Sequence, residues 1–201
     1  FPERFDARLE PEGWQRSSFD DRAWPVAVER TDTKLTPPSE FLPRPIPPLT
    51  EKRLVPVRVL GAGLCEDAEL TSWADDSDIT ASLWRMKLLP DAGRLKPALS
   101  APCVWPKGAV SARLKPGEAA YLMLDFGMNT LATLAFTAHG PAGAIIDLAH
   151  SECLWNNRVA TEWQSPSFKQ AERAILRKGV TSHRFNQPRG FRYMIVRIAN
   201  P

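Results

Sequence analysis

Residues 122–154 read LMLDFGMNTLATLAFTAHGPAGAIIDLAHSECL, and residues 173–196 read RAILRKGVTSHRFNQPRGFRYMIV. Both stretches consist of short apolar segments separated by Gly and Pro, a pattern typical of β-strands joined by turns. We expect strands at 121–126, 131–137 and 144–148, at the spacing of an antiparallel sandwich. Turns are expected at Lys115-Pro116-Gly117 and at 140–143. The predicted fold class is all-β, with an antiparallel, jelly-roll-like β-sandwich as its main part.

The segment Phe191–Ile198 is apolar on both of its faces. Successive side chains of a strand point to opposite sides of the sheet. The expected alternation places Phe191, Tyr193 and Ile195 on one face and Met194, Val196 and Ile198 on the other. A strand of this kind has both faces covered, so we expect it to lie at the centre of its sheet.

Composition and charge exclude several classes of protein. The 201 residues are 43% hydrophobic and 24% charged, which is ordinary for a globular chain that buries a core. The 26 Lys and Arg are spread along the chain among 23 Asp and Glu, so no nucleic-acid partner is expected. No apolar run approaches the roughly 20 residues of a membrane helix, so no membrane partner is expected either.

The cysteines and the N-terminal stretch say little about the compartment. Cys65, Cys103 and Cys153 are odd in number and far apart, which supports neither a disulfide framework nor a zinc site. The stretch FPERFDARLEPEG is too polar for a signal peptide. Extracytoplasmic and cytoplasmic locations both stay open, and we expect no cofactor.

Three segments follow one another along the chain. Residues 1–33 are too short to bury a core alone, and within them Phe19-Asp20-Asp21 is expected to form a turn in which a carboxylate accepts backbone N–H bonds. Residues 34–56 are rich in proline, which fixes φ and lacks an N–H donor, so an extended, semi-rigid connector is expected. Residues 57–201 are expected to form the main sandwich domain, beginning with a short strand at 57–60.

Four motifs occur in a fixed order in the second half of the chain: Asp125-Phe126-Gly127, Gly140-Pro141-Ala142-Gly143, His150-Ser151-Glu152-Cys153-Leu154 and Arg189-Gly190-Phe191-Arg192-Tyr193. This order resembles the α-L-rhamnosidases of glycoside hydrolase family 78, whose sandwich before the catalytic barrel carries D-x-G, G-x-x-G, E-x-L and GFRY elements. Upstream, FDDRAWPVA at 19–27 is similar to an element of that family's galactose-binding-like jelly-roll modules, and Arg44-Pro45-Ile46-Pro47 is similar to an R-x-I-P connector between the two.

The resemblance implies a non-catalytic accessory region, with a partial galactose-binding-like element at 1–33. In the family, the catalytic carboxylates lie on an (α/α)6 barrel that follows the GFRY strand, so no catalytic residue is expected here, and Glu152 belongs to the sandwich. The expected partner is the catalytic domain of the same, rhamnosidase-like protein. The resemblance also favours a strand at Arg173–Leu176, although Ser167 and the residues after it have helical propensity.

Glycosidic hydrolysis needs two carboxylates about 5 to 9.5 Å apart. Asp125, Asp147 and Glu152 are available, but strands and turns give them no pairing signature, and Asp147 is expected to face solvent. His150 and Ser151 are neighbours on a strand and point to opposite faces, so no base–nucleophile pair is expected.

The run Asp75-Asp76-Ser77-Asp78 offers oxygen ligands of the kind that Ca²⁺ prefers, but it lacks the spacing of an EF-hand loop. We expect a solvated loop and no metal; calcium binding is the alternative.

Exposed tryptophan rings can stack on the apolar CH faces of sugars. Trp155 and Trp163 flank a polar loop, and the candidate carbohydrate-binding residues are Trp155, Trp163, Asn156 and Arg158. The alternative is that these rings cover a neighbouring domain. Trp14 and Trp24 are expected to be core residues.

Arg189 and Arg192 are expected to pair with carboxylates at the interface to the catalytic domain; binding of an anionic sugar is the less favoured reading. The predicted function is therefore an accessory region that supports a catalytic domain and can bind carbohydrate. The alternative is a stand-alone, lectin-like or structural module.

Overall fold

The computed structural model describes residues 3–29, 43, 45–48, 50–66, 79–91, 93–97, 110–162 and 170–201, apart from the side chains of 96 and 97. The chain divides into two compact units: Phe1–Glu10 with Leu54–Pro201 (unit 1), and Pro11–Arg53 (unit 2). Trp163, the acidic run 75–78 and residues 34–42 of the proline-rich segment lie outside the described residues.

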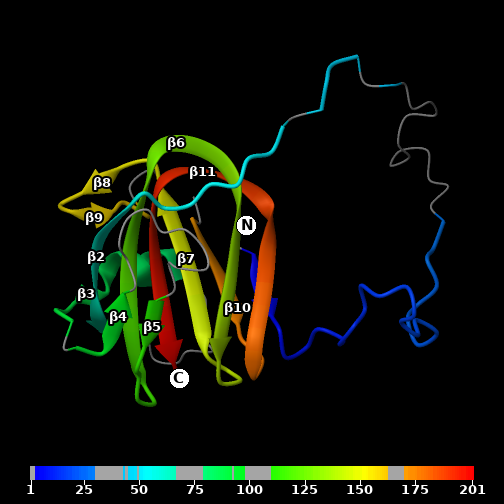
Figure 1. Cartoon of the computed structure of the whole chain (residues 1–201), viewed down its shortest axis with the longest axis horizontal. Coiled ribbons are helices and arrows are strands. Elements are labelled where there is room, and N and C mark those ends of the chain that lie inside the picture. Colours follow the sequence, from blue (N-terminus) through cyan, green and yellow to red (C-terminus); the bar gives the residue numbers. More distant parts are fainter. Residues whose placement is uncertain are drawn as a thin grey trace. The chain divides into compact units, whose positions relative to one another are not determined.

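Unit 1 is mainly β, as predicted, and seven of its strands form one mixed sheet in the order β1-β10-β7-β11-β6-β2-β3 (Figure 1). These strands are β1 (Arg4–Asp6), β2 (Arg58–Glu66), β3 (Lys87–Leu88), β6 (Glu118–Gly140), β7 (Ile145–Ser151), β10 (Ala171–Ile175) and β11 (Gly179–Asn200). The other described elements are helix α1 (Ile79–Arg85), the pair β4 (Leu95–Pro97) and β5 (Val110–Ala112), and the pair β8 (Leu154–Trp155) and β9 (Arg158–Val159).

One strand pair of the sheet is parallel. β1 runs parallel to β10, whereas the other neighbours in the sheet are antiparallel. The prediction of antiparallel strands thus holds for the described pairs within residues 57–201, whereas β1, from residues 1–33, makes the sheet mixed. The physical reason is connectivity. A tight turn forces the two strands that it joins to run antiparallel, whereas β1 and β10 lie far apart in the chain and can pair in either direction.

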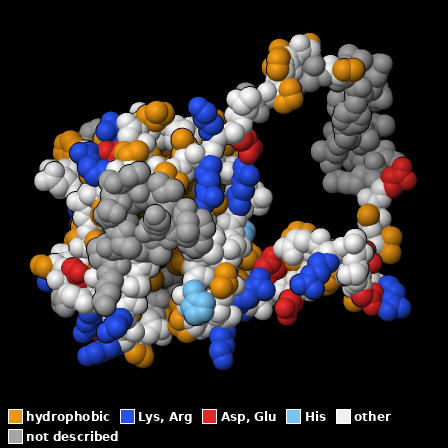
Figure 2. Space-filling view, in the orientation of Figure 1, with side chains coloured by type: hydrophobic (Ala, Val, Ile, Leu, Met, Phe, Trp, Pro, Cys, Tyr) orange, Lys and Arg blue, Asp and Glu red, His pale blue; other side chains and the backbone are white. Residues whose placement is uncertain are grey.

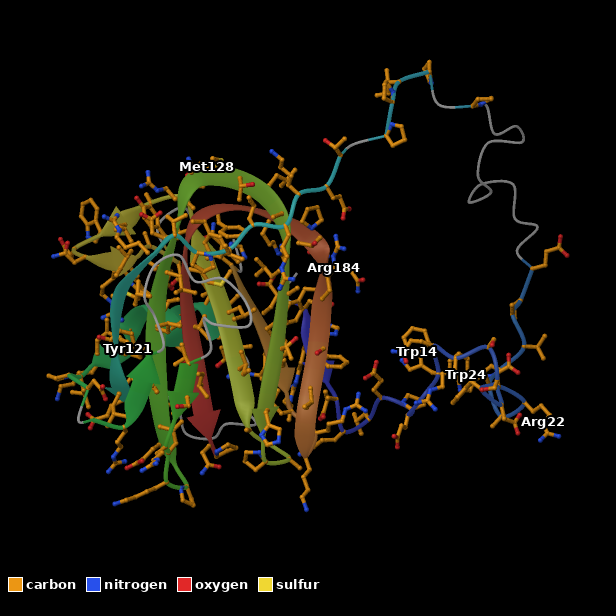
Figure 3. All side chains as sticks on the ribbon, viewed as in Figure 1. Trp14, Arg22, Trp24, Tyr121, Met128 and Arg184 are labelled. Atoms are coloured by element: carbon orange, nitrogen blue, oxygen red, sulfur yellow. The ribbon has the colours of Figure 1, made fainter. Side chains whose placement is uncertain are left out.

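β6 and β11 form one long, bent ribbon. They pair from Glu118 opposite Asn200 to Gly140 opposite Gly179, with register breaks between Arg184 and Pro188 and between Phe191 and Tyr193. Figure 1 shows both strands arching over at one end of the sheet. Figure 3 places Tyr121 on the straight part of β6, Met128 at the arch and Arg184 on the outer part of β11.

The bend joins what the sequence predicted as two strands, 121–126 and 131–137, into a single strand. Gly127 takes a φ of 83°, which lets the chain turn without ending the strand. β11 bends at the same place because the irregularity between Phe191 and Tyr193 leaves Arg192 without a partner in the register.

Two apolar clusters cover the two faces of the sheet. One lies between the sheet and the outer halves of β6 and β11, residues 131–140 and 179–190. It includes Leu122, Leu124, Leu134, Ile146, Leu148, Phe185, Phe191 and Met194. The other lies under α1 and β9, and includes Tyr121, Met123, Ala149, Val159, Ile195, Ala199, Ile79, Leu83 and Met86. The central strands are thus buried on both faces.

The prediction of a central strand at Phe191–Ile198 is confirmed, since β11 lies between β7 and β6. The predicted alternation is wrong for Phe191, which the register break moves into the cluster that contains Met194. The strand expected at Arg173–Leu176 is confirmed as β10. The turns at 115–117 and 140–143 are confirmed by backbone bonds from Glu118 N–H to the Lys115 carbonyl and from Ala144 N–H to the Pro141 carbonyl.

Unit 2 shows no helix or strand among its described residues. The turn at Asp20 is confirmed, because its Oδ1 accepts the Arg22 backbone N–H at 3.2 Å. Trp14 and Trp24 are 44% and 48% exposed, so the expectation that they are core residues is wrong. The unit is too small to enclose two indole rings, and Figure 3 shows both on this thin segment.

On the face drawn in Figure 2, the described Lys and Arg side chains are spread among acidic and apolar ones. No helix among the described residues has the length and apolar character needed to span a membrane.

Candidate functional site

The predicted carbohydrate-binding residues lie on the β8–β9 hairpin. Its two central residues, Asn156 and Asn157, have φ values of 48° and 59°. Two positive φ values in a two-residue loop are typical of a type I′ turn, which Asn tolerates better than most residues. Trp155 and Arg158 are cross-strand partners, so their side chains share one face of the hairpin. Trp155 is 48% exposed.

Arg158 fixes the hairpin to helix α1. Its Nη2 donates to the Met86 carbonyl at 2.7 Å and to the Leu83 carbonyl at 3.4 Å. A cation at these last carbonyls also opposes the negative end of the helix. The guanidinium lies over the Trp84 ring, 5.8 Å from its centroid. Burial lowers the pKa of Arg158 from its ordinary value, yet an arginine stays charged near neutral pH.

The hairpin thus presents a half-exposed indole beside two turn amides. An indole face can stack on the CH face of a sugar, while an amide can bond its hydroxyls. Of the four predicted residues, the structure brings together Trp155, Asn156 and Arg158. The Arg158 guanidinium is engaged by the helix, so its contribution is to position the hairpin.

Asp147 lies between two arginines at the centre of the sheet. Its register partners are Arg173 on β10 and Arg197 on β11, and all three residues are fully buried. Arg173 Nε lies 2.7 Å from Oδ1, and Arg197 Nη2 lies 2.8 Å from Oδ2. The Arg197 Nη1 also donates to Ser82 Oγ of α1 at 2.6 Å.

The expectation that Asp147 faces solvent is therefore wrong. It points to the face of the sheet that α1 covers, and its charge is compensated there by side chains from the two neighbouring strands.

Asp125 is bound by two arginines at the arch of the ribbon. Arg192 Nε and Nη2 donate to it at 2.9 and 3.3 Å, and Arg58 Nη2 donates at 2.8 Å. The Gly127 N–H donates to Oδ1 at 2.8 Å. These bonds, that from Arg192 first, lower the pKa of Asp125 to about 2. The side chain is a carboxylate at any physiological pH.

Glu172 is the third buried carboxylate. Its Oε1 lies 2.6 Å from Arg189 Nη2, and its Oε2 lies 3.4 Å from His150 Nε2. Arg189 and Arg192 were expected to pair with carboxylates at an interface to another domain. The pairing with carboxylates is confirmed: Arg189 pairs with Glu172 and Arg192 with Asp125, both in unit 1. The interface to another domain stays a prediction.

Three of the four sequence motifs meet at the arch. Asp125 of the D-x-G element bonds Gly127 and also Arg192 of the GFRY element. A Cβ added at Gly190 would lie 3.3 Å from Oε1 of Glu152, the acid of the E-x-L element. These three motifs, which lie apart in the sequence, therefore all belong to one structural feature, the bend of β6 and β11.

No group of three or more His, Cys, Asp or Glu side chains suited to a metal ion occurs in the described part of the chain. The predicted calcium alternative, at 75–78, falls outside it. Cys65 is buried, and Cys153 is partly buried.

No protein-family model matches the chain, and no curated protein matches it. Solved structures do. The GH78 rhamnosidase of Bacillus sp. GL1 is 21% identical with a TM-score of 0.43, and the match covers 56% of this chain and 11% of that one. The α-L-rhamnosidase from Aspergillus terreus is 25% identical with a TM-score of 0.33, covering 39% and 11%.

A rhamnosidase from Klebsiella oxytoca with rhamnose bound is 19% identical with a TM-score of 0.36, and the match covers 71% of this chain and 24% of that one. The matched part is thus less than a quarter of each of these enzymes. The chain resembles a small part of these rhamnosidases, of which that of Bacillus sp. GL1 is a GH78 family enzyme.

Proposed function

We propose that this chain is a non-catalytic accessory β domain of a rhamnosidase-like glycoside hydrolase, and that it supports the catalytic domain of the same protein. The observation that carries the proposal is that the buried carboxylates are all in ion pairs. Among the described residues these are Asp125, Asp147 and Glu172, and each is paired with at least one arginine of its own unit.

Asp125 is unsuited to act as the acid of glycoside hydrolysis. The reaction needs one carboxyl group that stays protonated, which requires a raised pKa. Asp125 has the opposite shift, to about 2. The ion pairs serve instead to hold β6, β7, β10 and β11 in one rigid arrangement.

In this proposal the sheet and the folded-back halves of β6 and β11 are the two layers of the predicted sandwich. The apolar cluster enclosed between them supports this view. Residues 57–201 are then the sandwich domain, 34–56 the connector, and 1–33 a partial galactose-binding-like element, all as part of the same proposal.

The absence of catalysis is tested with the full chain and a chromogenic α-L-rhamnoside. We expect no release of the chromophore above buffer. Release that is lost in Glu152→Gln, a substitution of an exposed acid, would contradict the proposal, because the reaction would then depend on a carboxylate of this chain.

We also propose that the β8–β9 hairpin binds carbohydrate weakly, through Trp155 and Asn156 with Arg158 as the positioning residue and Trp163 as the second ring. The half exposure of the Trp155 ring supports this role. The same exposed ring favours the alternative function, a stand-alone lectin-like module.

Titration of rhamnose-containing glycans into the full chain, followed by NMR, tests the hairpin. We expect Trp155→Ala to weaken binding by about two- to tenfold, because a stacked ring contributes roughly 0.5–1.5 kcal/mol beyond its buried area and about 1.4 kcal/mol corresponds to a factor of ten. Trp24→Ala is the matched control, since Trp24 is also 48% exposed but lies in unit 2. Equal effects of the two substitutions would reject the hairpin as the binding site.

A further inference from the structure

Strand β1 lies at one edge of the sheet and is held there by its backbone. Its three residues pair in parallel register with Arg173, Ala174 and Ile175 of β10. Two more bonds extend the pairing on both sides: the Arg173 N–H donates to the Glu3 carbonyl at 3.0 Å, and the Ala7 N–H donates to the Ile175 carbonyl at 2.9 Å. The docked segment therefore spans residues 3–7 at least.

Side chains of the same segment contact β11. The Phe5 ring stacks on the His183 ring, with centroids 3.7 Å apart and an interplanar angle of 6°. The Glu3 carboxylate accepts bonds from the Asn186 backbone N–H at 2.8 Å and from its Nδ2 at 3.3 Å. These contacts select for one register, because a shift by one residue would turn Phe5 away from His183.

Further contacts follow along the segment. Ala7 is 2% exposed, and Glu10 pairs with Arg177, which comes directly after the end of β10. Leu9, in contrast, is 80% exposed. Backbone pairing gives such a docked strand its affinity, and pockets for alternate side chains give it specificity. Residues 3–10 thus have the contacts of a bound peptide.

The covalent route to this segment is long. After Glu10 the chain passes through unit 2, about 40 residues, before it returns at Leu54 and enters β2. β1 and β2 lie at positions one and six of the strand order. A link of this length gives the tethered strand an effective concentration on the order of millimolar, so a single chain fills its own site at ordinary dilution.

We propose that the outer edge of β10 is a strand-docking site, filled here by residues 3–10 of the same chain and filled by the same segment of a second copy when the intrachain route is closed. We name a second copy as the other occupant because all the contacts described above are made by residues of this sequence, so another copy can make the same ones. The proposal is independent of the proposed function, since neither the hairpin nor the buried carboxylates take part.

Cleavage of the full chain tests whether the segment behaves as a ligand. A protease site inserted between Val28 and Glu29, in unit 2, allows the chain to be cut after it has folded. We expect residues 1–28 to stay bound, and a fluorescent peptide of residues 1–12 to replace them at one peptide per protein, seen as a rise in fluorescence anisotropy. The uncut chain should bind this peptide far more weakly.

Two competitor peptides provide a matched comparison. Phe5→Ala removes the ring that stacks on His183 and should compete at least about tenfold less well than the unchanged peptide. Leu9→Ala alters an exposed side chain and should compete equally well. Absence of peptide binding by the cut protein, or equal loss with both peptides, would overturn the docking site.

The second copy is tested by shortening the link. Deletion of residues 11–53 joins Glu10, which pairs with Arg177, directly to Leu54. Glu10 is then four Cα steps, or about 15 Å at 3.8 Å for each step, from Val57, whose N–H is bonded to the Asp125 carbonyl. β1 and β2 are five strand spacings apart, or roughly 24 Å along the sheet. We expect a dimer by light scattering, with β1 exchanged between copies. A folded monomer that retains the β1–β10 pairing would overturn the exchange.

Discussion

At the scale of single residues, the charged centre of the sheet is the most demanding feature of the fold. Asp147, Arg173 and Arg197 come from three adjacent strands and are removed from water together. Removing one partner from such a set is strongly destabilising, because it leaves charge buried without compensation. The carboxylate is the more critical member, since it alone faces two guanidinium groups.

We predict that Asp147→Asn lowers the free energy of unfolding by about 3–5 kcal/mol, measured by urea denaturation with circular dichroism. Asp20→Asn is the control. Asp20 accepts two bonds from the Arg22 guanidinium, at 2.8 and 2.6 Å, but the pair is exposed. Exposed pairs contribute little, so its urea midpoint should not change measurably. Equal losses in the two variants would contradict the role given to burial.

Asp125 predicts a dependence of stability on pH. Its folded pKa of about 2 lies below the ordinary value of 3.8. A group with a lowered folded pKa contributes stability that is fully present above pH 3.8 and is lost as the pH falls toward 2. Asp125→Asn should therefore be less stable than the natural chain at pH 6, and the difference should shrink between pH 4 and pH 2. A constant difference in urea midpoint over this range would exclude the predicted linkage.

At the scale of elements, the β8–β9 turn has a backbone requirement of its own. Asn157 has a φ of 59°, a conformation that costs β-branched residues about 1–2 kcal/mol. We predict that Asn157→Val lowers the melting temperature, whereas Asn157→Gly preserves or raises it, because Asn-Gly is the favoured pair for this turn. Differential scanning calorimetry measures both. A loss of equal size in the Gly variant would show that the amide, and not the backbone, matters.

The sequence predicted the elements whose signal is local. The two turns around Pro116 and Pro141 were predicted from Gly and Pro positions. β10 was predicted only from the family resemblance, against a local helical propensity. β11 was recognised as central because both of its faces are apolar. The hairpin at Trp155 was predicted only as a polar loop, although Asn156-Asn157 is a sequence that allows a tight turn.

Features that depend on distant partners were not predictable in this way. A single acid in a strand, such as Asp147, suggests a solvent-facing position, and the arginines that bury it lie 26 and 50 residues away. Gly127 was predicted to follow the end of a strand, whereas it lies at a bend within one. The matching bend in β11 lies far along the chain, and the sequence does not show that the two belong together. The role of Arg158 required helix α1, which the sequence reading did not include.

At the scale of the whole molecule, the two units should differ in local stability. Among residues 12–28 of unit 2 the described side chains are mostly exposed, and the backbone bonds are those of turns. The central strands β7 and β11 have partners on both edges and apolar clusters on both faces. Amide exchange follows the free energy of local opening.

We predict that the amides of 12–28 exchange within seconds in hydrogen–deuterium exchange mass spectrometry, while those of β7 and of 193–199 in β11 stay protected for hours. β1 should be intermediate, since it has one partner strand. Protection of 12–28 equal to that of β7 would show that unit 2 has a core of its own.

The order of the strands also bears on how the chain assembles during translation. β6 and β7 are joined by a tight turn and leave the ribosome one after the other, yet in the sheet β11 lies between them. Consecutive strands usually become neighbours, so a nascent chain that has not yet reached β11 tends toward a β6–β7 hairpin. Such a pairing would have to open before the last strand could enter, so we expect this insertion to be a slow and aggregation-prone step of biosynthesis.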